Sequence, residues 1–262
     1  MTQEIFQVDA FANRVFSGNP AGVCILDNWL DDATMQNIAM ENNLAETAFL
    51  VKKSKNEYDL RWFTPMVEVD LCGHATLASA HVLYSHYKLE DEELIFYSRS
   101  GKLIVKKIKQ DTYQLDFPSD EAVGTKVNID TQSIFGIPIV EIYEGKDDYI
   151  FVAENQEAVE KCSPNFRLVS QVGKRGSLLT SRGIDHDFVS RGFFPNVGID
   201  EDPVTGSAHT LLTPFWAKRL NKSTLSAKQI SKRGGEIECE ISGDRVLLTG
   251  RAITYLKGEI YI

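Results

Sequence analysis

Residues 61–70 read RWFTPMVEVD, and residues 191–200 read RGFFPNVGID. Arg, Phe, Pro, Val and Asp recur at matching positions, and a second Val in the first stretch is matched by Ile in the second. The offset from residue 61 to residue 191 is 130, about half of the 262-residue chain, and it sets Cys72 opposite Asp202. We interpret the repeat as homology rather than chance, because self-similarity at a fixed spacing marks repeated structural units. The sequence therefore predicts two related halves.

Helices that begin with glycine are predicted to follow both copies of the repeat. From residue 73 the chain reads GHATL, and after a three-residue insertion the second copy reads GSAHTL from residue 206. Small and apolar side chains continue at helical spacing over a wide arc in both places. Such a pattern is typical of a helix that is buried on most sides.

Short runs of β-branched and aromatic residues surround these two helices. Turn residues such as Ser100-Gly101 and Gly243-Asp244 separate the runs, which predicts strands. The fold class is therefore α+β, with two pseudo-symmetric domains that each wrap a mixed β-sheet around a central helix. We expect residues 1–120 to form the first domain and residues 121–262 the second, and the last strand can pack back on the first domain.

The charge balance and the cysteine pattern exclude several classes of protein. The chain has 28 Lys and Arg against 37 Asp and Glu, a net charge of −9, which argues against a nucleic-acid partner because such binding needs a basic face. Neither a secretion signal nor an apolar run long enough for a membrane span is found in the sequence. The four cysteines lie far apart, which favours reduced thiols. We expect a cytoplasmic protein without a membrane partner, and a small anionic substrate stays open.

The first turns of the two buried helices are candidate anion sites. Free backbone N–H groups and the helix dipole favour a carboxylate at a helix N-terminus, here at Gly73 and Gly206. The alternative is that both glycines only permit tight packing or a turn.

Titratable side chains flank both helix starts. Cys72 and His74 lie beside the first, and Asp202, Ser207 and His209 lie beside the second. A helix N-terminus favours the ionised form of a thiol or a carboxylate, which makes these groups candidate acids or bases. The alternative for each one alone is a buried thiol or a satisfied core imidazole. A zinc site made of Cys72, His74, His81 and His86 is disfavoured, because no second Cys or carboxylate follows at ligand spacing, and no metal is predicted.

One further carboxylate, Glu46, stands where the first amphipathic helix gives way to an apolar strand. Leu44 and Phe49 lie nearby in the sequence, so we expect partial desolvation, which suits a general acid/base. The alternative is a surface Glu in a connecting loop, and Glu41 and Glu68 are weaker rivals for the role.

Several motifs in a fixed order resemble the phenazine-biosynthesis PhzF-like family, which is part of the diaminopimelate epimerase-like fold superfamily. In this sequence they read VDAF from residue 8, GNPAGV from residue 18, NLAETAF from residue 43, FTP from residue 63, CGHAT from residue 72, DPVTGSA from residue 202 and SKRGG from residue 231.

The resemblance implies an isomerase that needs no cofactor and moves a proton on a small carboxylated substrate between two similar domains. It gives Glu46 the role of the acid/base and makes His74, Asp202 and Ser207 assisting catalytic residues. Substrate binding is implied at five positions, which are Asn19, Cys72, Gly73, Thr205 and Gly206. A homodimer is expected for the family.

Departures from the family pattern keep two alternatives open. Diaminopimelate epimerases use two cysteines, whereas here Cys72 is opposed by Asp202 in the repeat. An amino-acid epimerase that uses this asymmetric pair is one alternative, and a catalytically silent protein that binds small carboxylates is the other. The resemblance does not imply phenazine synthesis itself, because Cys72 and Ala45 both differ from the pattern usual in the phenazine enzymes.

Overall fold

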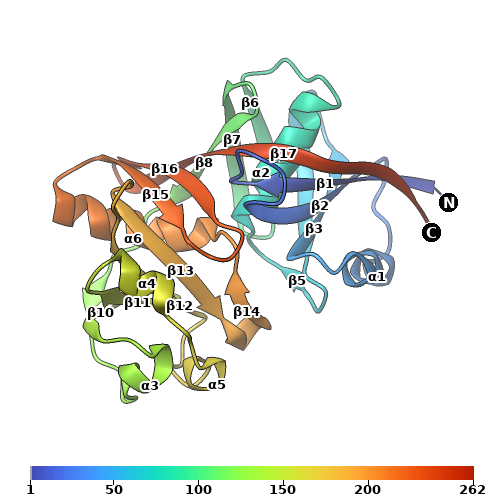
Figure 1. Cartoon of the computed structure of the whole chain (residues 1–262). Helices are drawn as coiled ribbons and strands as arrows, with labels where there is room; N and C mark the ends of the chain where they lie inside the picture. Colours follow the sequence, from blue (N-terminus) through green and yellow to red (C-terminus); the bar gives the residue numbers. More distant parts are fainter. Residues whose placement is uncertain (1) are drawn as a thin grey trace. The chain divides into compact units, whose positions relative to one another are not determined.

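The computed structural model describes residues 2–262, and the chain divides into two compact units (Figure 1). The first unit comprises Met1–Asp116 and Thr249–Ile262, and the second comprises Phe117–Leu248. The boundary expected after residue 120 therefore falls after Asp116. The C-terminal strand also divides, and its part from Thr249 onward belongs to the first unit.

The first unit is a strongly curved mixed sheet that closes on itself. β2 (Asn19–Leu26) pairs with β3 (Glu46–Lys52) in parallel, as β4 (Glu57–Phe63) does with β6 (Glu93–Ser98), and the sheet also contains antiparallel pairs. A short strand, β5 (Glu68–Val69), extends the end of β4. The strands follow one another in the order β17 (Arg245–Tyr261), β1 (Thr2–Ala10), β2 (Asn19–Leu26), β3 (Glu46–Lys52), β4 (Glu57–Phe63), β6 (Glu93–Ser98), β7 (Gly101–Lys109) and β8 (Thr112–Pro118), and β8 pairs with β17 again.

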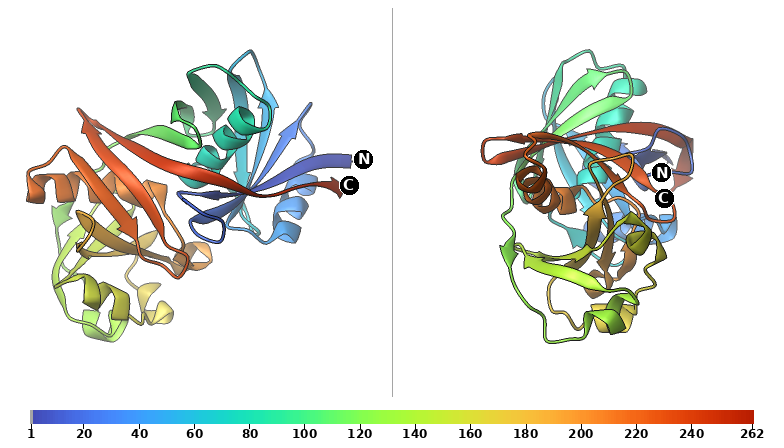
Figure 2. Two further views of the ribbon diagram at one scale, coloured as in Figure 1. Left: turned by 45° about the horizontal axis from the view of Figure 1, so that its top comes forward. Right: turned by 60° about the vertical axis from the view of Figure 1, so that its left-hand side comes forward.

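Helix α2 (Gly73–Ser85) is the core of this unit. All residues from Gly73 to Tyr84 are buried, and the helix contacts β1, β2 and β3 (Figure 2). Its alanines and glycine allow close approach of the sheet, which explains the wide apolar arc in the sequence. A second helix, α1 (Asp32–Asn42), begins at the N-cap Asp31, which accepts a hydrogen bond from the Thr34 N–H.

The second unit repeats this plan and adds short helices. Its central helix is α6 (Gly206–Leu220), whose apolar side contacts β15 and β16. Three short helices, α3 (Thr131–Phe135), α4 (Gln156–Lys161) and α5 (Phe166–Val169), contribute to a separate apolar cluster. Its strands are β9 (Val123–Gly124), β10 (Ile139–Glu144), β11 (Asp148–Ala153), β12 (Gly176–Arg182), β13 (Phe188–Phe194), β14 (Ile199–Asp202), β15 (Thr224–Gln229) and β16 (Gly235–Ser242). The predicted α+β class, with one central helix in each half, is confirmed. None of the helices within residues 2–262 has the length and apolar character needed to cross a membrane.

A partly buried ion pair marks the repeat in both units. The Arg61 guanidinium donates from Nε and Nη2 to the two carboxylate oxygens of Glu68, both at 2.7 Å. Arg191 donates in the same way to Glu201, at 2.7 and 2.9 Å. Each guanidinium also lies over the phenylalanine two residues later, at 5.1 and 5.2 Å from the ring centre. Two parallel hydrogen bonds fix the relative orientation of the two side chains and also contribute energy. Each ion pair therefore stabilises the turn that follows β4 or β13.

These contacts correct the sequence register of the repeat. From Glu68 to Glu201 the offset is 133, and Trp62 and Gly192, which stand 130 apart, pair with Val69 and Asp202. The N-cap residues of the two central helices are Cys72 and Thr205, which are also 133 apart. The equivalence of Cys72 with Asp202 was therefore wrong. The insertion lies before Glu201, where a 3₁₀ turn (Pro195–Val197) and the left-handed Gly198 lengthen the loop.

Two buried histidines give the fold a defined dependence on pH. Burial lowers the pKa of His209 and of His81 to about 4 in each case. An unfolded chain takes up these protons near pH 6.5, whereas the folded chain takes them up only near pH 4, so acidification within this window favours unfolding.

We therefore expect the free energy of unfolding to fall between pH 6.5 and 5, and His209→Asn to weaken that fall by up to about 1.4 kcal/mol per pH unit. The Asn amide can still donate to the Thr205 carbonyl, which accepts from His209 Nδ1 at 2.8 Å. Urea unfolding across this pH range measures the effect, with His186→Asn at a partly exposed position as the control. Identical pH profiles for the wild type and His209→Asn would contradict the assignment.

Candidate active site

Four of the predicted site residues meet in the first unit. Asn19 and Glu46 are the first residues of the parallel neighbours β2 and β3, so both lie at the same edge of the sheet. Cys72 is the N-cap of α2, and His74 lies in its first turn. His74 Nε2 lies 3.1 Å from Glu46 Oε2, and His74 Nδ1 lies 3.2 Å from Asn19 Nδ2 and 3.5 Å from Cys72 Sγ. The imidazole is therefore the centre of the cluster.

The Glu46 and His74 side chains are nearly enclosed, with exposed fractions of 12% and 6%. Their facing atoms, Oε2 and Nε2, are close enough for an ion pair, yet neither has an aligned hydrogen-bond partner within the part of the chain that the structure describes. Buried polar atoms without a hydrogen bond are rare in proteins and call for a reason. A group of a bound ligand can complete the geometry, which makes this pair the strongest candidate for chemistry.

The proton of His74 faces Glu46. Because the Asn19 amide N–H₂ is a donor, Nδ1 of the neutral ring accepts from it, and the ring proton then sits on Nε2. A second proton on Nδ1 requires the Asn19 amide to present its oxygen instead. In either state Nε2 carries a proton toward the Glu46 carboxylate.

The charge of His74 depends on Glu46. Burial by itself lowers the pKa of the imidazole, but the contacts with Cys72 and Glu46 act against burial, and the pKa lies well above the ordinary 6.5. The Cys72 thiol has its own pKa raised to about 11, first by burial and then by the Glu46 charge, so it is neutral near pH 7. The Glu46 carboxylate is therefore the group that favours the imidazolium at neutral pH.

This geometry corrects the expectation that Cys72 is activated by the helix N-terminus. The thiol is buried, and the desolvation of its charged form outweighs the helix dipole. Cys72 therefore lines the site as a neutral thiol in contact with His74.

The other predicted residues form a second cluster around the start of α6. The Thr205 hydroxyl donates to Asp202 Oδ2 at 2.6 Å, and the Thr205 N–H donates to Gln229 Oε1 at 2.9 Å. The Gln229 amide in turn donates to the Asp202 carbonyl at 2.7 Å. Gln229 is almost fully buried and was missed from the sequence, because an amide at the end of β15 shows no pattern of its own. These three side chains hold the segment that leads into Gly206 and the partly exposed Ser207.

Both central helices present their first turn without a side-chain cap. Neither Cys72 nor Thr205 accepts a hydrogen bond from the turn that follows it. The backbone N–H groups around Gly73 and Gly206 therefore receive no hydrogen bond from these cap side chains, and the anion site at the helix starts stays a prediction.

The remaining sequence candidates have structural roles. His209 is fully buried, stays neutral because burial lowers its pKa, and donates to the Thr205 carbonyl. Glu68 is bound by Arg61 and Arg99, and Glu41 is exposed. His81 and His86 both contact the Thr254 hydroxyl and do not contact His74.

A metal ion is the other occupant that the first cluster could suggest. One ligand atom each of Glu46, Cys72 and His74 lies within 4.8 Å of the others. However, Glu46 faces Nε2 of the ring while Cys72 faces Nδ1, so one ion bound to either nitrogen would lie on the wrong side for the third ligand. The donor set fits proton transfer better than metal binding.

The chain matches the phenazine biosynthesis-like protein family over residues 8–258. It belongs to this family. An uncharacterized isomerase of Pseudomonas aeruginosa is 48% identical over 260 residues, which cover 99% of both chains. A crystal structure of a PhzF-family phenazine biosynthesis protein from Enterococcus faecalis is 48% identical, with a TM-score of 0.96 over all of both chains. A predicted epimerase from Pseudomonas aeruginosa shares the fold at 18% identity, with a TM-score of 0.79. The family resemblance expected from the motifs is confirmed, and the protein is an isomerase.

The Glu46→Gln substitution tests the electrostatics of the site. Without the carboxylate, burial dominates, and we expect the pKa of His74 to fall below its ordinary value. NMR titration of the imidazole nitrogens measures this pKa. The matched control is Glu41→Gln, at an exposed position in α1, which should leave the His74 titration unchanged. A His74 pKa that does not move in Glu46→Gln would show that another group sets its charge.

Proposed function

We propose that this protein is a cofactor-independent isomerase that moves a proton on a small carboxylated metabolite by general acid/base catalysis. The observation that carries the proposal is the enclosed pair of Glu46 and His74, whose facing atoms lie 3.1 Å apart without an aligned hydrogen bond. A group that takes a proton from carbon must be ionised, desolvated and free to turn toward the substrate. Glu46 is nearly enclosed, and its Oε2 has no aligned hydrogen bond among residues 2–262, so the carboxylate can turn toward a substrate.

In the proposed reaction, the Glu46 carboxylate removes a proton from a carbon of the substrate. The C–H bond breaks, and its electron pair is delocalised toward the substrate's unsaturated or carboxylate group. Glu46 then returns the proton to a different carbon, so that one C–H bond is exchanged for another and no oxidant or reductant is needed. The His74 imidazolium offsets the negative charge as it moves from Glu46 to the substrate and back.

The substrate carboxylate is proposed to bind at the uncapped helix starts, where Gly73 and Gly206 supply N–H groups without adding formal charge. We further propose that Asp202, Thr205 and Ser207 of the second unit assist in the reaction. The repeat supports this, since it gives each unit one such helix. Four free, buried cysteines support the cytoplasm as the location.

A thiol mechanism is the main rival, and the structure gives it less support. An epimerase that pairs Cys72 with Asp202 needs a thiolate, whereas burial raises the pKa of Cys72 to about 11. The two residues also do not hold equivalent places in the repeat, since Thr205 is the N-cap that matches Cys72.

Deuterium incorporation during turnover tests the proposal. With a panel of cyclic and amino-acid carboxylates in deuterated buffer, mass spectrometry should find a substrate that takes up label. We expect Glu46→Gln to lower that rate by about 10²-fold or more, because the variant has no base at the reacting carbon. Cys72→Ser should stay within a few-fold of the wild type, and Glu41→Gln is the matched control.

The outcomes separate the three readings. Loss of exchange in Cys72→Ser with exchange retained in Glu46→Gln would favour the thiol epimerase. If carboxylates raise the melting temperature but none exchanges label in any variant, the protein is a silent binding protein and the proposal fails.

Metal removal provides an independent check. Because no step of the proposed reaction uses a metal, we expect exhaustive dialysis against a chelator to leave the turnover number unchanged. Added Zn²⁺ should not raise it. Loss of activity that is restored by one metal ion would contradict the proposed mechanism and assign Glu46, Cys72 and His74 as ligands.

A further inference from the structure

The C-terminal end of helix α2 borders a cavity that takes no part in the proposed reaction. Tyr84 and Ser85, the last residues of α2, line a hollow of about 490 Å³ together with residues of the β7–β8 hairpin. Along the helix axis about 15 Å separates Tyr84 from His74, so the cavity lies apart from the Glu46–His74 pair. A volume of this size accepts a small molecule. The lining consists of Tyr84, Ser85, Lys88, Lys107, Gln110, Asp111 and Tyr113.

Two lysines of this lining have no carboxylate partner. Neither Lys88 nor Lys107 forms an ion pair with any residue that the structure describes. Lys107 Nζ lies 5.0 Å from the centre of the Tyr84 ring, which stacks on the Tyr113 ring at 5.6 Å. Lys88 has a φ of 56°, a left-handed conformation that is strained for lysine and free of strain for glycine. Such strain is typical of functional sites, and here it places a second ammonium group at the cavity.

Asp111 gives the same cavity a negative charge. The Ser85 hydroxyl donates to its Oδ1 at 3.4 Å, and His81 Nδ1 lies 3.7 Å from that oxygen. Burial lowers the pKa of His81 to about 4, so this imidazole is neutral near pH 7 and does not offset the carboxylate. Neither lysine of the cavity is paired with Asp111 among residues 2–262, so charges of both signs stay available to a ligand.

The Tyr84 hydroxyl is a further polar group without a partner. Tyr84 is 4% exposed, and its hydroxyl oxygen makes no hydrogen bond within the described part of the chain. The Tyr113 hydroxyl, by contrast, lies 3.1 Å from His81 Nδ1. A buried hydroxyl without a partner calls for a reason, and a polar group of a ligand in the cavity that Tyr84 lines would supply one.

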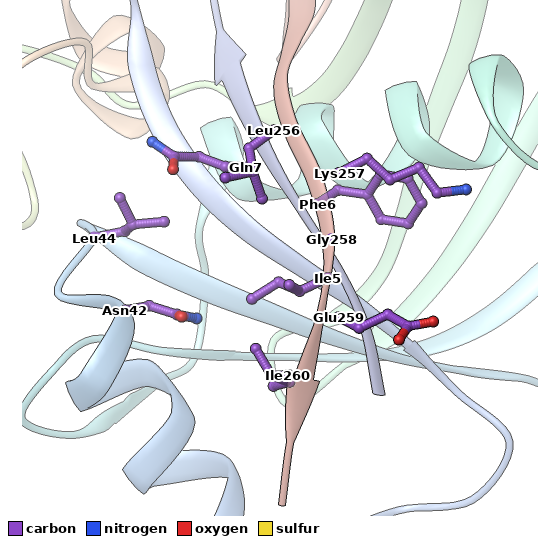
Figure 3. Close-up of a pocket in the computed structure, with 10 residues that line it drawn as sticks. All are labelled: Ile5, Phe6, Gln7, Asn42, Leu44, Leu256, Lys257, Gly258, Glu259 and Ile260. Carbon is purple, nitrogen blue, oxygen red and sulfur yellow. The ribbon is translucent and has the colours of Figure 1, made fainter. Parts of the chain in front are cut away.

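Another hollow of the first unit has a different character (Figure 3). It measures about 330 Å³, and Lys257, which contributes to its lining, already binds Glu4 at 2.8 Å. A charged small molecule is therefore better matched by the cavity at the end of α2. The apolar residues around the hollow in Figure 3 are Ile5, Phe6, Leu44, Leu256 and Ile260.

We propose that the cavity at the end of α2 binds a free α-amino acid as a zwitterion. The ligand's carboxylate lies between the ammonium groups of Lys88 and Lys107, and its ammonium group donates to the Asp111 carboxylate. The stacked rings of Tyr84 and Tyr113 contact its carbon atoms, and their faces also attract the ammonium group. A plain anion would be repelled by Asp111 and a plain cation by the two lysines, so the lining favours a molecule that carries both charges.

Amide NMR spectra of the labelled protein test this site. At least one of the standard protein amino acids should shift the backbone signals of Ser85, Gln110 and Thr112, with a dissociation constant of about 1 mM or below. The same shifts should persist in Glu46→Gln, because the cavity lies apart from that residue. No shift with any standard amino acid at about 10 mM would overturn the proposal, and so would shifts that disappear in Glu46→Gln.

Variants of the two charge signs test the assignment of the ligand's groups. Lys107→Gln and Asp111→Asn should each raise the dissociation constant about tenfold. Asparagine tolerates the left-handed backbone of residue 111, where φ is 54°, so the turn is retained. Lys106→Gln is the matched control, because successive side chains of β7 point to opposite faces of the sheet. Equal affinities of the wild type and the two cavity variants would contradict the proposed site.

Two analogues of the amino acid that binds separate a zwitterion site from a simpler one. The deaminated acid should bind the wild type about tenfold more weakly, and Asp111→Asn should not weaken it further. The amino amide, which lacks the carboxylate, should be insensitive to Lys107→Gln. A deaminated acid that binds as tightly as the amino acid would show a plain anion site and overturn the proposal.

Discussion

The burial of helix α2 is the constraint on which the rest of the site depends. A helix that is covered along nearly its whole length can be accommodated only if the sheet curves around it, and the closed order of strands in the first unit does this. The first turn of α2 is then also removed from water. Cys72 and His74 meet the ends of β2 and β3 in a place where a charge is costly unless another charge compensates it. The protonation states of the cluster follow from this: a neutral thiol, and an imidazole whose charge depends on Glu46.

The two halves share one architecture but carry different side chains at equivalent places. Both keep the arginine–glutamate pair and an uncapped central helix, so both keep the geometry that exposes backbone N–H groups. At the helix start, however, the first unit carries a thiol and an imidazole, while the second carries a hydroxyl bound to a carboxylate. In the proposed function, the anion site is thus the shared part, and the proton chemistry belongs to one half.

Much of the fold followed from the sequence because its signals are local. The runs of β-branched and aromatic residues, and the apolar residues at helical spacing after Gly73 and Gly206, are local patterns. The folded chain forms the strands and helices that these patterns predict. The short strands β5, β9 and β14 were missed because so few residues show no alternation. The register error at Asp202 has a different cause. The inserted turn at Pro195–Val197 carries a Pro and a Val that match the first copy by position, so the identities continued past the true point of insertion.

The site was predictable only in part. The motifs indicated that Glu46 and His74 belong to the site. Their 3.1 Å contact, however, is a tertiary contact between residues 28 positions apart, which the sequence does not show. Cys72 was a candidate acid or base because the helix start is visible in the sequence, whereas the burial that keeps the thiol neutral is not. Gln229 was invisible for the same reason, since its role lies in the three contacts that it makes around Thr205 and Asp202.

A structure of the protein with a substrate that exchanges its proton tests the central claim most directly. If Glu46 is the acid/base, its Oε2 should lie about 3–3.5 Å from the exchanging carbon, with the substrate carboxylate at a helix start. A substrate whose exchanging carbon lies against Cys72 Sγ or the Asp202 carboxylate, with Glu46 still turned toward His74, would contradict the account.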